Sequence, residues 1–164
     1  MEQVILMCGP AGSGKSTLAR RLEREGYVRL SFDEEAWRRG FRTHPVPEEG
    51  CLVVHQHLQR RLSDAVTSGE RVVVDTSFWS RAARDKYREF LAPFGVTPVV
   101  LHVRTPRSIL LSRLRNRVNG GPNDIHVPFE TALAYLDGFQ APTSDEGPVR
   151  VVSGASDDPG TPVN

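Results

Sequence analysis

A glycine-rich segment near the start of the chain has the spacing of a loop that binds the phosphates of a nucleotide. The run GPAGSGKS, from Gly9 to Ser16, satisfies the pattern GxxxxGK[ST]. In such a loop the glycines let backbone N–H groups converge on phosphate, Lys15 reaches the outer phosphates, and the hydroxyl of Ser16 ligates Mg²⁺. We therefore predict that the chain binds a nucleoside triphosphate, ATP, together with Mg²⁺. The predicted nucleotide contacts are Gly9, Ala11, Gly12, Ser13, Gly14, Lys15, Ser16 and Thr17.

Two aspartates follow apolar segments further along the chain. Asp75 ends the run RVVVD, where proteins with this loop hold the Mg²⁺ shell through a carboxylate, so Ser16 and Asp75 are the predicted metal residues. Asp33 follows YVRLSF, and an aspartate near the terminal phosphate can accept the proton of an attacking hydroxyl. For both aspartates the alternative is a helix cap, because Asp is a favoured capping residue.

Arginine is the dominant basic residue, since lysine occurs only at positions 15 and 86 among 21 basic residues. Arg113 and Arg117 lie four residues apart on one face of a predicted helix, before a loop with two adjacent glycines. We predict that this segment is a mobile lid whose arginines close over the triphosphate and stabilise the charge of the transferring phosphoryl group. A solvated cationic helix end is the alternative.

Further arginines follow each aspartate. Arg38 comes after Asp33 and Arg81 comes after Asp75. Both arginines are predicted to contact an anionic acceptor, because a guanidinium matches the oxygens of a phosphate or carboxylate. Genome composition is the alternative explanation for the abundance of arginine. The five histidines have no spacing typical of metal ligands, so we assign them no chemistry.

The elements that must position these residues alternate between strands and helices. Apolar runs predict strands at 4–8, 27–32, 71–75, 97–103 and 149–152. Helical spacing predicts helices at 16–24, 51–68, 80–94, 106–117 and 128–139, with a loop at 119–124. This alternation implies an α/β fold with a mostly parallel sheet, helices on both faces and ligands at the C-terminal edge of the strands. The glycine-rich loop, Asp33 and Asp75 all fall on that edge.

Composition limits the kind of protein this is. The chain has 164 residues, of which 38% are hydrophobic and 25% charged, so we predict one domain over residues 1–154 and a flexible tail at 155–164. No apolar run is long enough for a membrane span, and the acidic start is unlike a targeting segment. Two cysteines flanked by apolar residues predict reduced thiols and a cytoplasmic location.

Four segments in order along the chain resemble those of a known family. They are GPAGSGKST at 9–17, LSFDEEAWRRG at 30–40, VVVDTSFWSRAARDKYR at 72–88 and LLSRLRNR at 110–117. The chain resembles small P-loop kinase-like proteins related to polynucleotide 5′-hydroxyl kinase, the zeta toxins and chloramphenicol phosphotransferase. The resemblance implies a three-layer P-loop fold with a five-stranded sheet core and a short lid, ATP as donor, and a kinase reaction on a hydroxyl. It also implies that Asp33 is the general base, that Asp75 is the aspartate after the third strand, and that Arg113 and Arg117 are the lid arginines.

The predicted function is transfer of the γ-phosphate of ATP to a hydroxyl of a small molecule. A net charge of only +1 and the lack of an additional domain in this sequence favour a small acceptor over the end of a polynucleotide. Three alternatives stay open: a nucleoside monophosphate kinase, a polynucleotide 5′-hydroxyl kinase, and a nucleotide-dependent switch that hydrolyses ATP without a small-molecule acceptor. The sequence names neither the acceptor nor the oligomeric state.

Overall fold

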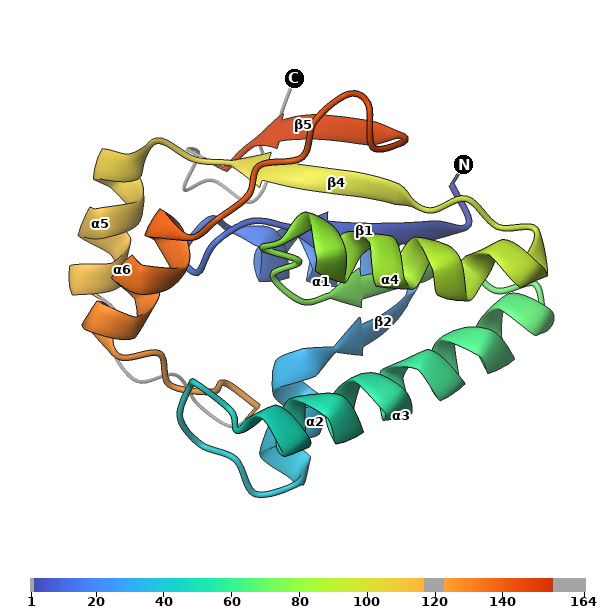
Figure 1. Cartoon of the computed structure of the whole chain (residues 1–164), viewed down its shortest axis with the longest axis horizontal. Coiled ribbons are helices and arrows are strands. Elements are labelled where there is room, and N and C mark those ends of the chain that lie inside the picture. Colours follow the sequence, from blue (N-terminus) through green and yellow to red (C-terminus); the bar gives the residue numbers. More distant parts are fainter. Residues whose placement is uncertain (1, 117–122, 155–164) are drawn as a thin grey trace.

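A parallel five-stranded sheet forms the centre of the fold (Figure 1). The computed structural model describes residues 2–116 and 123–154. The strands are β1 (Val4–Cys8), β2 (Val28–Ser31), β3 (Val72–Asp75), β4 (Val99–Arg104) and β5 (Val149–Ser153). They lie in the order β2-β3-β1-β4-β5, and each neighbouring pair runs parallel. The predicted parallel sheet is confirmed.

Helices cover both faces of this sheet. Alternate side chains of β1 belong to two separate apolar clusters, because successive residues of a strand point to opposite faces. Helices α3 (Glu48–Thr67) and α4 (Arg81–Leu91) pack on the face that carries Leu6. Helix α1 (Lys15–Arg24) packs on the opposite face, with Met7 (Figure 1). Burial on both sides explains why β1 is an uninterrupted apolar run.

The capping alternative for the two aspartates is wrong. Helix α2 (Phe32–Arg38) follows β2 directly, and its N-cap is Ser31, whose hydroxyl accepts the N–H of Glu34. The predicted strand at 27–32 therefore ends one residue early, and Asp33 lies in the first turn of α2. Helix α4 is capped by Ser80 rather than Asp75. Both carboxylates are thus available for other contacts.

Other predicted boundaries shift by a few residues. Helix α3 begins at Glu48, before the apolar periodicity starts, since two glutamates suit the positive N-terminus of a helix. The helix predicted at 80–94 divides into α4 and a 3₁₀ turn, η1 (Ala92–Phe94). Helices α5 (Arg107–Arg115) and α6 (Phe129–Asp137) lie between β4 and β5. Most of the predicted loop at 119–124 and the predicted tail at 155–164 lie outside the described residues. No helix among the described residues is long and apolar enough to cross a membrane.

A buried ion pair joins α4 to the segment before β5. The guanidinium of Arg84 donates to both carboxylate oxygens of Glu146, from Nε at 2.7 Å and from Nη2 at 3.1 Å. Its third nitrogen, Nη1, donates to the carbonyl of Phe78 at 2.8 Å. Arg88 adds a further hydrogen bond to Glu146 at 2.9 Å. This network fixes the loop between β3 and α4, where Phe78 has a left-handed backbone with φ of 45°.

We expect the stabilising contribution of Glu146 to be lost in acid. Burial alone would raise the pKa of its carboxyl, but hydrogen bonds from Arg84 and Arg88 outweigh burial and lower that pKa from 4.5 to about 2. A depressed carboxyl pKa stabilises the folded state above the unfolded pKa, and this contribution is lost as the pH falls toward the folded pKa. The shift is worth about 3 kcal/mol of unfolding free energy.

Urea unfolding between about pH 5 and pH 2.5 measures this contribution. The Glu146→Gln variant should lose much less unfolding free energy over that interval than the wild type, while a variant at the exposed Glu23, Glu23→Gln, should follow the wild type. An equal loss in the wild type and Glu146→Gln would contradict the assignment.

Candidate functional site

The P-loop, residues 9–16, lines a cavity of about 960 Å³ at the C-terminal edge of the sheet. Gly12 and Gly14 have φ of +82° and +97°, a left-handed conformation that glycine adopts without strain. At Gly9 an added Cβ would lie 2.6 Å from the hydroxyl oxygen of Ser13, so the turn is too tight for a side chain. The loop therefore has the open backbone that phosphate oxygens require.

Six of the eight predicted nucleotide contacts line the cavity. They are Ala11, Gly12, Gly14, Lys15, Ser16 and Thr17. The other two, Gly9 and Ser13, do not line the cavity, and their backbone groups hold the loop in place. The N–H of Gly9 donates to the carbonyl of Ser77 at 3.1 Å, and the carbonyl of Ser13 accepts a hydrogen bond from Thr105 at 2.9 Å.

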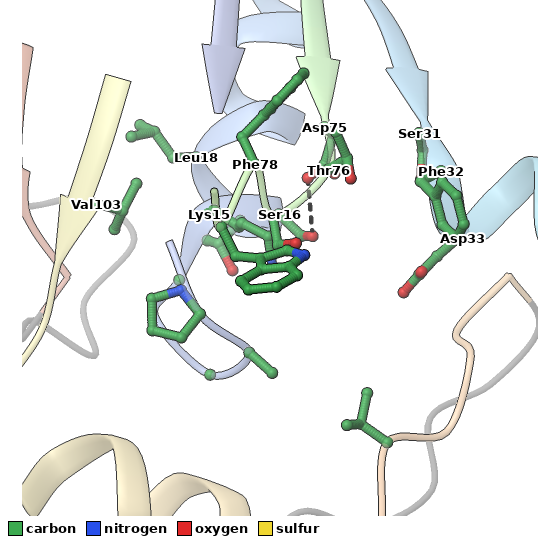
Figure 2. A pocket seen from close by; sticks show the side chains of 18 of the residues that line it. Lys15, Ser16, Leu18, Ser31, Phe32, Asp33, Asp75, Thr76, Phe78 and Val103 are labelled. Carbon is green, nitrogen blue, oxygen red and sulfur yellow. Dashed lines mark hydrogen bonds between the residues drawn. The ribbon is translucent and has the colours of Figure 1, made fainter. Parts of the chain in front are cut away.

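Ser16 and Asp75 meet at the end of the P-loop (Figure 2). The hydroxyl of Ser16 donates to Oδ1 of Asp75 at 3.3 Å, although 59 residues separate them in the sequence. A hydroxyl and a carboxylate are hard oxygen donors, which Mg²⁺ prefers, and both side chains line the cavity beside the phosphate-binding backbone. This donor set fits the predicted Mg²⁺, so Ser16 and Asp75 stay the predicted metal residues.

Arg29, which was not among the predicted site residues, holds Asp75 in place. Its Nε and Nη2 donate to Oδ2 of Asp75 at 3.0 and 2.7 Å, while Nη1 donates to Glu34 at 2.8 Å. Oδ1 of Asp75 stays on the side of Ser16. The available signal was a lone arginine inside the apolar strand YVRLSF, because a buried guanidinium needs a carboxylate partner.

Removal of Arg29 is expected to destabilise the fold strongly. The side chains of Arg29 and Asp75 are only 4% and 3% exposed. In Arg29→Met the carboxylate of Asp75 stays buried without its partner, which typically costs about 3–5 kcal/mol. Chemical denaturation measures the loss, and Arg81→Met, which removes an exposed arginine, is the matched control. If both variants unfold at the wild-type denaturant concentration, Arg29 does not have this role.

Asp33 enters the cavity from the start of α2 (Figure 2). Nε2 of His44 lies 3.1 Å from Oδ1 of Asp33. Because an ionised carboxylate only accepts hydrogen bonds, Nε2 carries the proton in this contact. The second oxygen of Asp33, Oδ2, is left for another donor. His44 is a second site residue that was not predicted, because the spacing of the histidines indicated no chemistry.

The predicted arginines take different places. Arg113 lines the cavity, and its Nη1 donates to the carbonyl of Gly12 at 2.9 Å, which links α5 to the P-loop. Arg117 lies outside the described residues. Arg38 pairs with the buried Glu35 at 2.7 Å, and Arg81 pairs with Asp145 at 3.0 Å. Neither Arg38 nor Arg81 is among the residues that line the cavity.

Aromatic and imidazole rings line the cavity beside Asp33. We call this group the aromatic collar: Phe32, His44, His55, Phe78, Trp79 and Tyr135. Phe32, Phe78, Trp79 and Tyr135 were not predicted as site residues, because they come from three segments that lie far apart in the sequence. Tyr87, which contacts His55 and Phe78, was not predicted either. Burial, with the nearby charge of Lys86, lowers the pKa of the His55 imidazole, which therefore stays neutral at neutral pH. Its Nδ1 lies 2.8 Å from the hydroxyl of Tyr87.

A match to a protein-family model identifies the family of the chain. Residues 4–142 match the family AAA_33, described as an AAA domain. The chain belongs to this family. The matched range contains the P-loop, both aspartates and the aromatic collar. Of the described residues that line the cavity, only Ser153 and Gly154 lie outside it.

This AAA domain is similar to a curated protein and to many solved structures. The UPF0200 protein PAE1629 from Pyrobaculum aerophilum is 31% identical over 142 residues, which are 81% of this chain and 75% of that protein. A sugar kinase from Janibacter sp. has a TM-score of 0.66 at 20% identity, covering 94% of this chain and 86% of that one. A gluconokinase from Sinorhizobium meliloti has a TM-score of 0.62 at 23% identity, covering 95% and 86%.

A chain of the Pnkp1/Rnl/Hen1 RNA repair complex has a TM-score of 0.71 at 15% identity, covering 84% of this chain and 43% of that one. At these identities the structures show a shared fold. The AAA domain therefore has the P-loop kinase-like fold, as its sequence segments indicated.

Proposed function

We propose that this protein is an ATP-dependent phosphotransferase that moves the γ-phosphoryl group of ATP to a hydroxyl of a small molecule. One observation carries the proposal: the P-loop and the carboxylate of Asp33 line the same cavity from different strand ends. Figure 2 shows Asp33 directed toward the space in front of Lys15 and Ser16. A site that only held a nucleotide would not need a carboxylate there, because a carboxylate repels the triphosphate.

Asp33 supplies the base in this proposal. The N–H of His44 holds Oδ1, so Oδ2 accepts the proton of the acceptor hydroxyl. The hydroxyl oxygen forms a bond to the γ-phosphorus while the bond from that phosphorus to the β–γ bridging oxygen breaks. The products are a phosphomonoester and ADP, and the proton resides on Asp33.

The donor is held on the opposite side of the cavity. Backbone N–H groups of the P-loop bind the phosphates, and Lys15 offsets the charge of the outer ones. Ser16 and Asp75 would hold Mg²⁺, which supplies positive charge to the triphosphate when bound. Arg113 lines the cavity beside the P-loop, where a guanidinium can stabilise the charge of the transferring group. Its role as a lid arginine stays a prediction.

Two alternatives receive support from particular observations. The likeness to a chain of an RNA repair complex makes a polynucleotide end an acceptor to be tested. The P-loop with Ser16 and Asp75 alone would serve a nucleotide-dependent switch. A nucleoside monophosphate kinase is less favoured, because its phosphate acceptor needs arginines, and Asp33 would oppose it.

A screen for phosphorylated products tests the proposal. The protein is incubated with ATP, Mg²⁺ and mixed hydroxyl-bearing metabolites and antibiotics, and mass spectrometry detects molecules that gain one phosphoryl group. We expect such a product together with an equal amount of ADP, and neither with the Lys15→Ala variant. Consumption of ATP that yields only orthophosphate would overturn the proposal and favour the switch. Preferential transfer to a 5′-hydroxyl oligonucleotide, weakened by salt, would favour the nucleic-acid kinase.

A further inference from the structure

The aromatic collar lies where the acceptor of the proposed transfer must bind, so this inference rests on the proposed function. Asp33 is next to Phe32 of the collar, and the side chain of His44 belongs to both the collar and the contact with Asp33. The acceptor must place its hydroxyl at Asp33 and its remaining atoms against the neighbouring rings. The collar therefore determines which molecules fit.

The rings of the collar form a continuous series. The ring centroids of Trp79 and Tyr135 are 6.4 Å apart, with 23° between their planes. Tyr135 contacts His44 at 6.5 Å, His44 contacts Phe32 at 6.1 Å, and Phe32 contacts His55 at 5.2 Å. Such a surface offers apolar area with few rotatable bonds, so it binds a ring or apolar face at low entropic cost.

The loop that carries Trp79 is held firmly from both sides. The carbonyl of Phe78 accepts a hydrogen bond from the buried Arg84, and the carbonyl of Trp79 accepts the N–H of Gln140 at 2.8 Å. Trp79 is nevertheless 42% exposed. A large aromatic ring that is fixed at the wall of a cavity but left partly exposed is well placed to be covered by a ligand.

Among the described residues that line the cavity, the cations lie away from the collar. Among the cavity-lining cations, Lys15 and Arg113 belong to the P-loop side, and three arginines lie on α1, which packs on the other face of the sheet. The guanidinium of Arg29 is paired with two carboxylates. The carboxylate of Asp33 lies beside the collar, in contact with His44.

An anionic acceptor would be unfavourable in this place. Its phosphate or carboxylate would lose water beside Asp33 and aromatic rings, while the described cations that line the cavity lie on the P-loop side, on α1 or in ion pairs with carboxylates. We infer that the acceptor is a hydroxyl compound that carries no phosphate or carboxylate, and that a ring or apolar face of it packs on Trp79 and Tyr135. The arginines that the sequence suggested for an anionic acceptor, Arg38 and Arg81, pair with Glu35 and Asp145 instead.

A charge-sorted library of alcohols tests the class of acceptor. Equal numbers of compounds with and without a phosphate or carboxylate are incubated with ATP and Mg²⁺, including pairs such as glucose with glucuronate and adenosine with adenosine 5′-phosphate. We expect kcat/KM to be at least about tenfold higher for the compounds that are not anionic. Preference for the anionic members would overturn the inference while the proposed function stands. If no member receives phosphate, both are overturned.

Variants of exposed aromatic residues test the place of binding. Trp79→Ala should raise KM for the best acceptor of the library about tenfold or more, with KM for ATP unchanged. Phe94→Ala removes an aromatic ring of similar exposure, 41%, outside the cavity and should leave both values unchanged. An unchanged acceptor KM in Trp79→Ala, or an equal rise in Phe94→Ala, would overturn the assignment of the collar.

Discussion

The Lys15→Ala variant is expected to lose ATP binding almost completely. Lys15 lines the cavity within the P-loop, and its ammonium is the cation that this loop type directs at the outer phosphates. The triphosphate carries several negative charges, so the loss should weaken Kd at least about a hundredfold, or about 2.7 kcal/mol. Isothermal titration calorimetry with ATP and Mg²⁺ measures this change directly.

The chain contains a matched control for this experiment. Lys86 is the other lysine, lies exposed on α4 and does not line the cavity. Lys86→Ala removes the same charge and should bind ATP like the wild type. If Lys15→Ala also binds ATP with wild-type affinity, the P-loop does not bind the triphosphate as described.

The Asp33→Asn variant is expected to bind ATP but to lose transfer. The amide keeps the size of the side chain and can still accept from His44, but it cannot take a proton from a hydroxyl. General-base catalysis contributes about 10²–10⁴ to the rate, so kcat should fall by that factor. ATP affinity should stay the same or improve slightly, since a negative charge near the triphosphate is removed.

Steady-state kinetics with an alcohol that the wild type phosphorylates gives kcat and both KM values. Asp64→Asn, the same change at an exposed position on α3, is the control and should be neutral. Transfer at the wild-type rate in Asp33→Asn would show that Asp33 is not the base. A rise in KM for ATP without a change in kcat would assign Asp33 to nucleotide binding instead.

The sequence was most informative where the chemistry depends on consecutive residues. The P-loop could be recognised because its glycines, lysine and serine lie within eight positions, and local backbone conformation alone brings them together. The alternation of strands and helices likewise indicated the parallel sheet, since each buried strand is a short apolar run. Asp33 and Asp75 could be placed on one edge because both follow such runs.

The contacts between these segments could not be predicted in the same way. Arg29 and Asp75 are 46 residues apart, and no local pattern links a strand arginine to a particular carboxylate. Proximity in sequence was also misleading for Arg38. Five residues along a helix rotate a side chain by about 140°, so Arg38 does not share the face of Asp33. The aromatic collar combines residues from α2, α3, α6 and two loops, and only the folded chain brings these rings together.

The fate of the γ-phosphoryl group is the most direct test of the proposed transfer. ATP labelled at its γ-phosphorus is incubated with the protein, Mg²⁺ and a mixture of uncharged alcohols, and the label is separated into phosphomonoester and orthophosphate. The proposal predicts that most of the released label is in a phosphomonoester with the wild type, and that Asp33→Asn forms far less of this ester. Label that appears only in orthophosphate, at the same rate in both proteins, would contradict it.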